Sequence, residues 1–436
     1  MSDNATGAPK RLGYWTCWSL TVGIMIGSGI FLLPATLAPY GLMSFGGWIV
    51  TAGGSVLLAL VFASLASRTS KSGGVYTYAR TAFGDLIGFL VAWGYWASYW
   101  IALPAIALAF VGYLGEFFPG LEGNAFAQAL SALGLIWLVT LINIKGVKEA
   151  GLVQIALTGL KLVPLLVIVV AALLFGSTEN FPELHPKGGS HIGVIATTAL
   201  LTMWAFSGLE AGTMPAGEVD RPESTIPKAI VGGTLMVALI YIGTVAAVMA
   251  LVPAEQLAAS ERPFADAARQ LGSWGPDLIS IGALIATAGA LNGVAFISGQ
   301  ISMVVAQDGL APRFLSRPSE GGASAASMLL AAILASLLLL ANYTRGLIGL
   351  FEFLIMMSTL ALLLPLLVCS VAELWHNWQS IRSWSTVAIL ASLYSVFAIF
   401  GSGLTVLLWG LVLFLVGLAV YFCFRPTRSQ PQAEEG

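Results

Sequence analysis

The sequence predicts an all-α integral membrane protein with twelve transmembrane helices. Hydrophobic residues make up 58% of the 436 positions and charged residues only 9%, whereas a soluble domain carries about 25% charged residues. Apolar segments long enough to cross a bilayer, which takes roughly 20 helical residues, follow one another along the chain. The twelve segments are 13–38, 44–67, 84–114, 125–144, 150–175, 191–216, 227–251, 275–305, 322–341, 346–372, 384–402 and 404–424.

The first apolar segment is interrupted at its centre by Gly27-Ser28-Gly29, and Pro34 follows. Glycine is a poor helix former, and unwound backbone within a bilayer is tolerated only where it lines a protein-enclosed cavity. The alternative is a contact of small residues between helices, but the Gly-x-Gly spacing does not repeat on one helix face. The sixth segment is interrupted similarly at Ser207-Gly208. Two broken helices, each the first of five, are typical of transporters with a five-plus-five inverted repeat, whose substrate site lies at the breaks.

The broken helices divide the chain into a transport core and flanking parts. We expect residues 1–12 to form an N-terminal cytoplasmic tail and residues 13–372 to form the ten-helix inverted-repeat core. Residues 373–424 are then two peripheral helices, and residues 425–436 are a second cytoplasmic tail.

Positive residues gather in the links on the side of the N-terminus, and an even number of spans places both termini there. Because lysine and arginine are retained in the cytoplasm, we expect both termini to be cytoplasmic. The expected location is the plasma membrane, namely a bacterial inner membrane. Lys161 lies inside a span. The positive residues on the opposite side are Lys187, Arg262, Arg269 and Arg345.

Composition and motifs argue against several other classes of protein. A net charge of −2 provides no basic face for nucleic acid. The cysteines lie in apolar runs and the histidines are scattered, so we expect neither a disulfide framework nor a metal site. The chain has no GxxxxGK[ST] loop and no catalytic cluster such as HExxH, so we expect no ATP drive, no enzyme and no cofactor. The residues MSDNATGAPKRLG have no compact apolar core or cleavage site, so we expect no removable signal peptide.

Several strings resemble a known family. They are GIMIGSGIFLLPATLA in the first segment, SKSGGVYTYARTAFG after the second, WAFSGLEAGTMPAGEVDRPESTIPKAI across the sixth, and PFADAARQLG and GQISMVVAQDGLAP around the eighth. Together they resemble the amino acid–polyamine–organocation (APC) permeases over roughly residues 10–425. The spacing is most similar to the basic amino acid/polyamine antiporter branch, which includes arginine/agmatine antiporters. The resemblance implies a LeuT-like fold, alternating access and a substrate site between broken helices 1 and 6.

The breaks and the resemblance together place the substrate. Amides around Ser28 are expected to bind a carboxylate, because helix N-termini and nests of N–H groups favour anions. Carbonyls freed at Ser207-Gly208 are expected to accept the substrate ammonium. The resemblance makes Trp204 an aromatic lid and Tyr95 an aromatic near the site, while the alternative for each is a buried packing residue. The predicted substrate-binding residues are Ile24, Ile26, Gly27, Ser28, Gly29, Tyr95, Trp204, Ser207 and Gly208.

Ionisable residues inside spans indicate coupling or gating. Lys161 lies about 15 Å into its helix at 1.5 Å per residue, which is too deep for easy snorkelling. The resemblance implies that Lys161 replaces a sodium ion and bonds carbonyls near Gly27, and whether it exchanges a proton stays open. Glu210 corresponds to a gating position of the antiporters, with a structural carboxylate as the alternative. The predicted coupling and gating residues are Lys161, Glu210, the gate-region Tyr76, Asn292, and Tyr99, which shares a helix face with Tyr95.

Several positions depart from the basic-substrate pattern. Polar amides of that branch are replaced by Ile24 and Leu103, and a helix 8 tryptophan is replaced by Val294. A buried cation without partners is costly, so we expect a secondary active transporter of neutral amino acids, by exchange or proton coupling. The alternative is a basic amino acid/polyamine antiporter, for which Glu352 offers an acidic partner. A membrane sensor or enzyme is a remote alternative, and proton coupling and a homodimer stay open.

Overall fold

The computed structural model describes residues 13–68, 74–146, 151–184, 190–210, 219, 221–377 and 382–424. Within these residues, the elements are α-helices and short 3-10 turns. In the part of the chain that the structure describes, eight helices are long and apolar enough to cross a membrane by length and composition. The long helices are α3 (Ser44–Arg68), α5 (Asp85–Leu114), α6 (Ala125–Lys145), α7 (Gly151–Phe175), α9 (Pro222–Leu251), α12 (Trp274–Gln307), α13 (Ala325–Asn342), α14 (Leu347–Asn377), α15 (Arg382–Phe400) and α16 (Gly403–Phe424).

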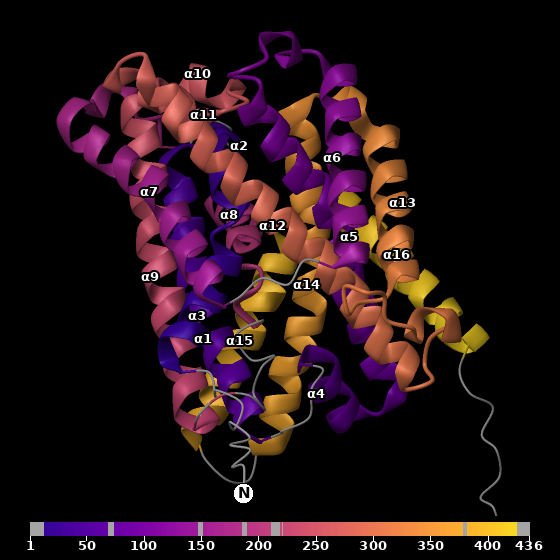
Figure 1. The fold of residues 1–436 in the computed structure, drawn as a ribbon. Helices are drawn as coiled ribbons and strands as arrows, with labels where there is room; N and C mark the ends of the chain where they lie inside the picture. The colour runs from indigo at the N-terminus through magenta and orange to yellow at the C-terminus, as the bar shows by residue number, and fades with distance from the viewer. Residues whose placement is uncertain are drawn as a thin grey trace, which may run out of the picture.

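The shorter helices lie at the breaks and at the two ends of the bundle. The first predicted segment forms α1 (Tyr14–Met25) and α2 (Gly29–Leu37), followed by the 3-10 turn η1 (Ala38–Met43). The sixth begins as α8 (His191–Phe206). In Figure 1, α10 (Ala254–Ala259) and α11 (Pro263–Ala268) cap the upper end, whereas α4 (Gly74–Phe83) lies at the lower end.

Each of the twelve predicted segments contains a helix, and the boundaries differ by a few residues. The helix α9 begins at Pro222 rather than at 227, because proline is well tolerated at the first helical position, where its missing N–H has no partner to lose. The helix α14 continues past 372 to Asn377. Its last turns include the fully buried Glu373, which accepts hydrogen bonds from Ser64 Oγ at 2.6 Å and Arg68 Nη2 at 3.3 Å. Polar contacts to α3 therefore extend this span beyond its apolar stretch.

The bundle is packed around α5, which contacts α12 and α14 along its length. The helices α3, α8 and α9 form a second packed group, and α1 packs against α7 and α9. Large apolar side chains such as Leu173, Leu239 and Leu404 are mostly exposed on the outside. Such an apolar exterior around a packed interior is expected of a chain whose solvent is lipid.

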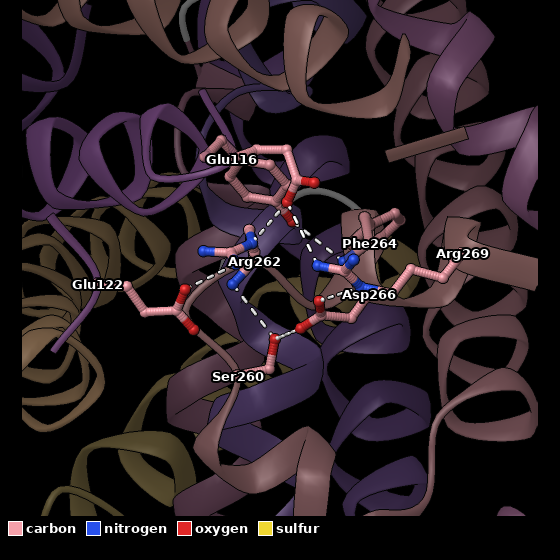
Figure 2. A network of polar contacts seen from close by, with 8 residues as sticks. Glu116, Glu122, Ser260, Arg262, Phe264, Asp266 and Arg269 are labelled. Carbon is pink, nitrogen blue, oxygen red and sulfur yellow. Dashed lines mark hydrogen bonds and ion pairs between the residues drawn. The ribbon is translucent and has the colours of Figure 1, made fainter. Parts of the chain in front are cut away.

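At the upper end, an ion-pair network joins the α10–α11 link to the link between α5 and α6 (Figure 2). Arg262 Nε lies 2.7 Å from Glu116 Oε2, and Arg262 Nη2 lies 2.9 Å from Glu122 Oε2. Burial alone would lower the pKa of the Arg262 guanidinium. The hydrogen bond to Glu122 and the charges of Glu122, Glu116 and Asp266 outweigh burial and raise this pKa, so Arg262 stays charged. The network therefore ties the two links together at physiological pH.

Below the network, Tyr113 joins three elements. Its hydroxyl donates to the Phe31 carbonyl of α2 at 2.8 Å and accepts from the Phe264 amide of α11 at 3.2 Å. The Phe31 ring meets the rings of Tyr113 and Phe264 edge to face, with centroids 5.6 and 5.5 Å apart. Hydrogen bonds and ring contacts therefore join α2, α5 and α11 at this end of the molecule.

We predict that Arg262→Met destabilises the protein by about 2–4 kcal/mol, because it leaves two carboxylates without their main cation. The side chains of Arg262 and Glu116 are only 11% and 14% exposed, so water replaces the lost contacts poorly. Thermal unfolding in detergent measures the effect. Arg345→Met, at an exposed arginine, is the control and should change little. Equal unfolding temperatures for Arg262→Met and wild type would contradict the role given to the network.

Candidate functional site

The break in the first span frees a backbone carbonyl. An unbroken helix would bond the Gly27 amide to the Gly23 carbonyl, but the Gly27 amide bonds the Met25 carbonyl at 2.8 Å instead. Tyr241 of α9 also donates to the Met25 carbonyl, at 2.6 Å. The amides that open α2 have no preceding helical turn to bond to. The break therefore offers a free carbonyl on one side and helix N-terminal amides on the other.

The second break lies at the end of α8, directly against the first. Ser207 leaves the helical conformation at ψ 134°, and Gly208 has φ +97°. A Cβ on Gly208 would lie 2.3 Å from Ile24 Cγ2, and a Cβ on Gly29 would lie 2.9 Å from Trp204 Cδ1. Glycine at both positions therefore allows the two breaks to touch. The segment that continues the sixth span, 211–218, lies outside the described residues.

A cavity of about 550 Å³ lies at the two breaks. Most of the predicted site residues line it, and they come from α1, α2, α5, α7, α8 and α12. The predicted residues in its wall are Ile24, Gly27, Ser28, Gly29, Tyr99, Lys161, Trp204, Ser207, Gly208 and Asn292. Ile26 and Tyr95 are buried but do not line the cavity, nor does Glu210.

Lys161 connects α7 to the first break. Its side chain is buried, and Nζ donates to the Gly23 carbonyl at 3.0 Å. This is the carbonyl that the break releases from its helical partner. A charged donor at this point compensates the desolvation of the carbonyl, so Lys161 stabilises the broken conformation of the first span.

Glu210 lies one layer behind the cavity wall. Tyr95 donates to Glu210 Oε1 at 2.9 Å, and the Tyr95 and Tyr99 hydroxyls are 3.1 Å apart. Tyr95 has one hydroxyl proton and donates it to Glu210. The Tyr99 hydroxyl therefore donates its proton to the Tyr95 oxygen and keeps its own lone pairs for groups in the cavity. The Glu210 carboxyl group is thereby linked through Tyr95 to a tyrosine that lines the site.

Tyr76 lies in a different place from the other predicted residues. It belongs to α4 and lines a second cavity of about 610 Å³. Its hydroxyl donates to Asp308 Oδ2 at 2.7 Å and accepts from Arg80 Nη1 at 3.0 Å. Burial, followed by the hydrogen bond to Asp308, raises the pKa of the Tyr76 phenol, so it stays protonated at physiological pH.

Only some of the residues that depart from the basic-substrate pattern line the cavity. Ile24 and Val294 line it, whereas Leu103 is buried outside the lining. Glu352 does not line it either, and accepts a hydrogen bond from Tyr40 at 3.0 Å. Sequence reasoning missed several lining residues on α5, α12 and α14, for which small size at helical spacing was the only available signal. The small ones include Ser98, Gly289, Ala290 and Ser358, and the large Phe296, which had no such signal, also lines the cavity.

The chain matches the amino acid permease family from residue 12 to residue 430, which is nearly its whole length. The chain belongs to the amino acid permease family. It is a secondary transporter of the APC superfamily, in the basic amino acid/polyamine antiporter branch, and it is not an enzyme. As a permease with several apolar helices, it is a multi-pass membrane protein.

Relatives of this permease cover most of its length. The arginine/ornithine antiporter of Pseudomonas aeruginosa is 30% identical over 97% of this chain and 92% of its own. The putrescine transporter PotE of Escherichia coli is 28% identical over 96% of this chain and 97% of its own. The cadaverine/lysine antiporter of Escherichia coli is 32% identical over 74% of this chain and 73% of its own. These names support a basic substrate, the alternative stated above, better than the neutral substrate that we expected first.

Proposed function

We propose that this permease is an antiporter for basic amino acids or the corresponding diamines, working by alternating access at the cavity between the two breaks. The observation that carries the proposal is similarity over nearly the full length to relatives named for arginine, ornithine and putrescine, and over 74% of the chain to one named for cadaverine and lysine. The groups that line the cavity are compatible with both ends of such a substrate.

The backbone groups at the breaks suit the amino-acid end of a substrate. The amides that open α2, around Ser28, carry the positive end of a helix dipole and favour a carboxylate. The carbonyls at the end of α8, around Ser207, favour an ammonium group. Trp204 is 7% exposed and packs across Gly29, so it covers this part of the cavity.

The aromatic wall suits a cationic side chain. Tyr99, Trp204 and Phe296 line the cavity, and aromatic faces attract cations by up to about 2 kcal/mol in a desolvated site. Glu210 strengthens this attraction through Tyr95 and Tyr99. The cation would then be held without a direct carboxylate contact.

Charge at the upper end of the molecule also favours cations. Among the described residues of this end, carboxylates outnumber arginines, and such a field raises the local concentration of positive substrates. The carboxylates are Glu116, Glu122, Glu179, Glu183, Glu255, Glu261, Asp266, Asp277 and Glu352, against Arg262, Arg269 and Arg345.

The finer topology belongs to the same proposal. We infer twelve spans with both termini in the cytoplasm, a LeuT-like five-plus-five core over 13–372 and two peripheral helices over 373–424. The tails 1–12 and 425–436 lie outside the described residues. Lys161 would occupy the place of a coupling sodium ion, which makes a sodium requirement unnecessary. Proton coupling and a homodimer stay open alternatives for the same transporter.

A neutral amino acid is the second candidate, and one observation favours it. Within the described part of the chain, the cavity lining holds the Lys161 ammonium and no carboxylate. A positive wall repels a cationic side chain and tolerates an apolar one. Apolar lining residues such as Ile24, Val294 and Ile297 agree with this candidate.

Exchange in proteoliposomes tests the proposal. Vesicles loaded with unlabelled ornithine should take up labelled arginine or ornithine far faster than empty vesicles. A competition panel of arginine, putrescine, leucine and alanine, with and without a pH gradient, separates the two candidates and detects proton coupling. Inhibition by leucine and not by arginine or putrescine would replace the basic substrate with the neutral one. Uptake equal to that of empty vesicles for every compound would exclude transport.

A further inference from the structure

Asn292 presents a hydrogen-bond donor to the cavity. It lies on α12, is half-buried and lines the cavity wall. Its Oδ1 accepts a hydrogen bond from Asn143 Nδ2 at 2.8 Å. In the part of the chain that the structure describes, its Nδ2 group donates to no protein acceptor. The amide oxygen is therefore occupied, and the amide nitrogen is available to a ligand.

Asn143 fixes this orientation from behind. It is buried in α6, and its Nδ2 is surrounded by three acceptors. These are Asn292 Oδ1 at 2.8 Å, the Val139 carbonyl at 2.9 Å and the Asn292 carbonyl at 3.4 Å. A flipped Asn143 would aim its own carbonyl at these oxygens, which is unfavourable. The Asn292 amide is thus held with its NH2 group away from Asn143.

The Lys161 ammonium borders the same stretch of α12. Gly289 lies three residues before Asn292 and therefore on the same helix face. A Cβ on Gly289 would lie 3.7 Å from Lys161 Nζ. This part of the wall combines an amide donor with a positive charge, which is the chemistry that binds an oxyanion.

We propose that the wall formed by Asn292, Gly289 and Lys161 is a subsite for one oxygen of the substrate carboxylate, that the other oxygen faces the amides that open α2, and that Asn143 is the positioning residue. The two places adjoin, because a Cβ on Gly27 would lie 3.0 Å from Ala290 Cβ on α12. The proposal rests on the transport function proposed above and names which substrates that function prefers. An amino acid carries a carboxylate, whereas the diamine that has lost this group carries no acceptor at all. The subsite therefore favours a basic amino acid over the diamine that its decarboxylation would give.

Ornithine and putrescine form the matched pair that tests this subsite, because they differ by one carboxylate. The readout is the ratio of their inhibition constants against exchange of labelled substrate. Asn292→Asp replaces the donor with a negative acceptor, so ornithine inhibition should weaken about 10- to 100-fold while putrescine inhibition stays or strengthens. Asn292→Leu should weaken only ornithine. Asn143→Leu should shift the ratio in the same direction by roughly 3-fold, since the Asn292 amide is then free to rotate.

Asn342→Asp is the matched control. This asparagine ends α13, donates to the Leu338 carbonyl at 3.0 Å and does not line the cavity. The ratio of the ornithine and putrescine inhibition constants in this variant should therefore equal that of wild type. An unchanged ratio in Asn292→Asp, including the case in which inhibition by both compounds weakens equally, would contradict the proposed subsite. If wild-type protein exchanges neither compound, the basic-substrate proposal fails by itself. The same variants are then compared with leucine and isopentylamine, which again differ by one carboxylate.

Discussion

Gly208→Ala is expected to reduce the exchange rate by about 100-fold or more. A residue with a side chain is strained by roughly 1–2 kcal/mol at the φ of +97° that Gly208 adopts. The new methyl group would also lie 2.3 Å from Ile24 Cγ2, so the end of α8 must move away from α1. Because both breaks line the cavity, this movement separates the groups that bind the two ends of the substrate. Initial rates of exchange in proteoliposomes measure the loss.

Gly243→Ala is the control for this experiment. Gly243 lies in α9, and a Cβ placed there meets no atom within 4 Å. Alanine also favours a helix over glycine by about 0.5–1 kcal/mol. This control should keep its rate and unfold at the same or a higher temperature. Wild-type exchange by a well-folded Gly208→Ala protein would show that contact between the breaks is unnecessary.

Lys161→Ala is expected to lower exchange by about 10- to 100-fold while the protein still folds. The substitution removes the side-chain donor to the freed Gly23 carbonyl, and a buried acceptor that loses its partner costs about 1–3 kcal/mol. The first span is then less stable in its broken form, and the cavity loses a positive charge. Flux should fall more than the unfolding temperature does, because the ammonium acts at the break.

Lys145→Ala separates this effect from a general loss of positive charge. Lys145 is exposed at the end of α6, away from the cavity lining. Its exchange rate should match that of wild type. Turnover at the wild-type rate in a stable Lys161→Ala protein would refute the role of Lys161.

Apolar length and local backbone chemistry made most of the fold predictable. A helix occurs in each expected segment because a bilayer requires both length and satisfied backbone groups. The break in the first span was predictable because Gly27-Ser28-Gly29 is unfavourable in a helix. The spacing of Tyr95 and Tyr99 also placed their hydroxyls correctly on one face, 3.1 Å apart.

The depth of each side chain was not predictable in the same way. Glu210 and Tyr95 stand behind the wall, and Tyr76 lines another cavity, because helix tilt and packing decide which face meets the cavity. The pairing of Asn143 with Asn292 joins two residues 149 positions apart, and no local pattern reveals such a contact. The argument for a neutral substrate was weakened for the same reason. Leu103, one of the residues that depart from the basic-substrate pattern, does not line the cavity.

A structure of the protein with a transported amino acid bound tests the central claim most directly. The claim is that the backbone groups released by the two breaks bind the charged ends of the substrate. The account predicts a substrate carboxylate oxygen about 3 Å from the amides that open α2, as expected for a charge-assisted hydrogen bond. A substrate bound away from the Gly27–Gly29 backbone, or a first span that becomes a continuous helix when substrate binds, would contradict it.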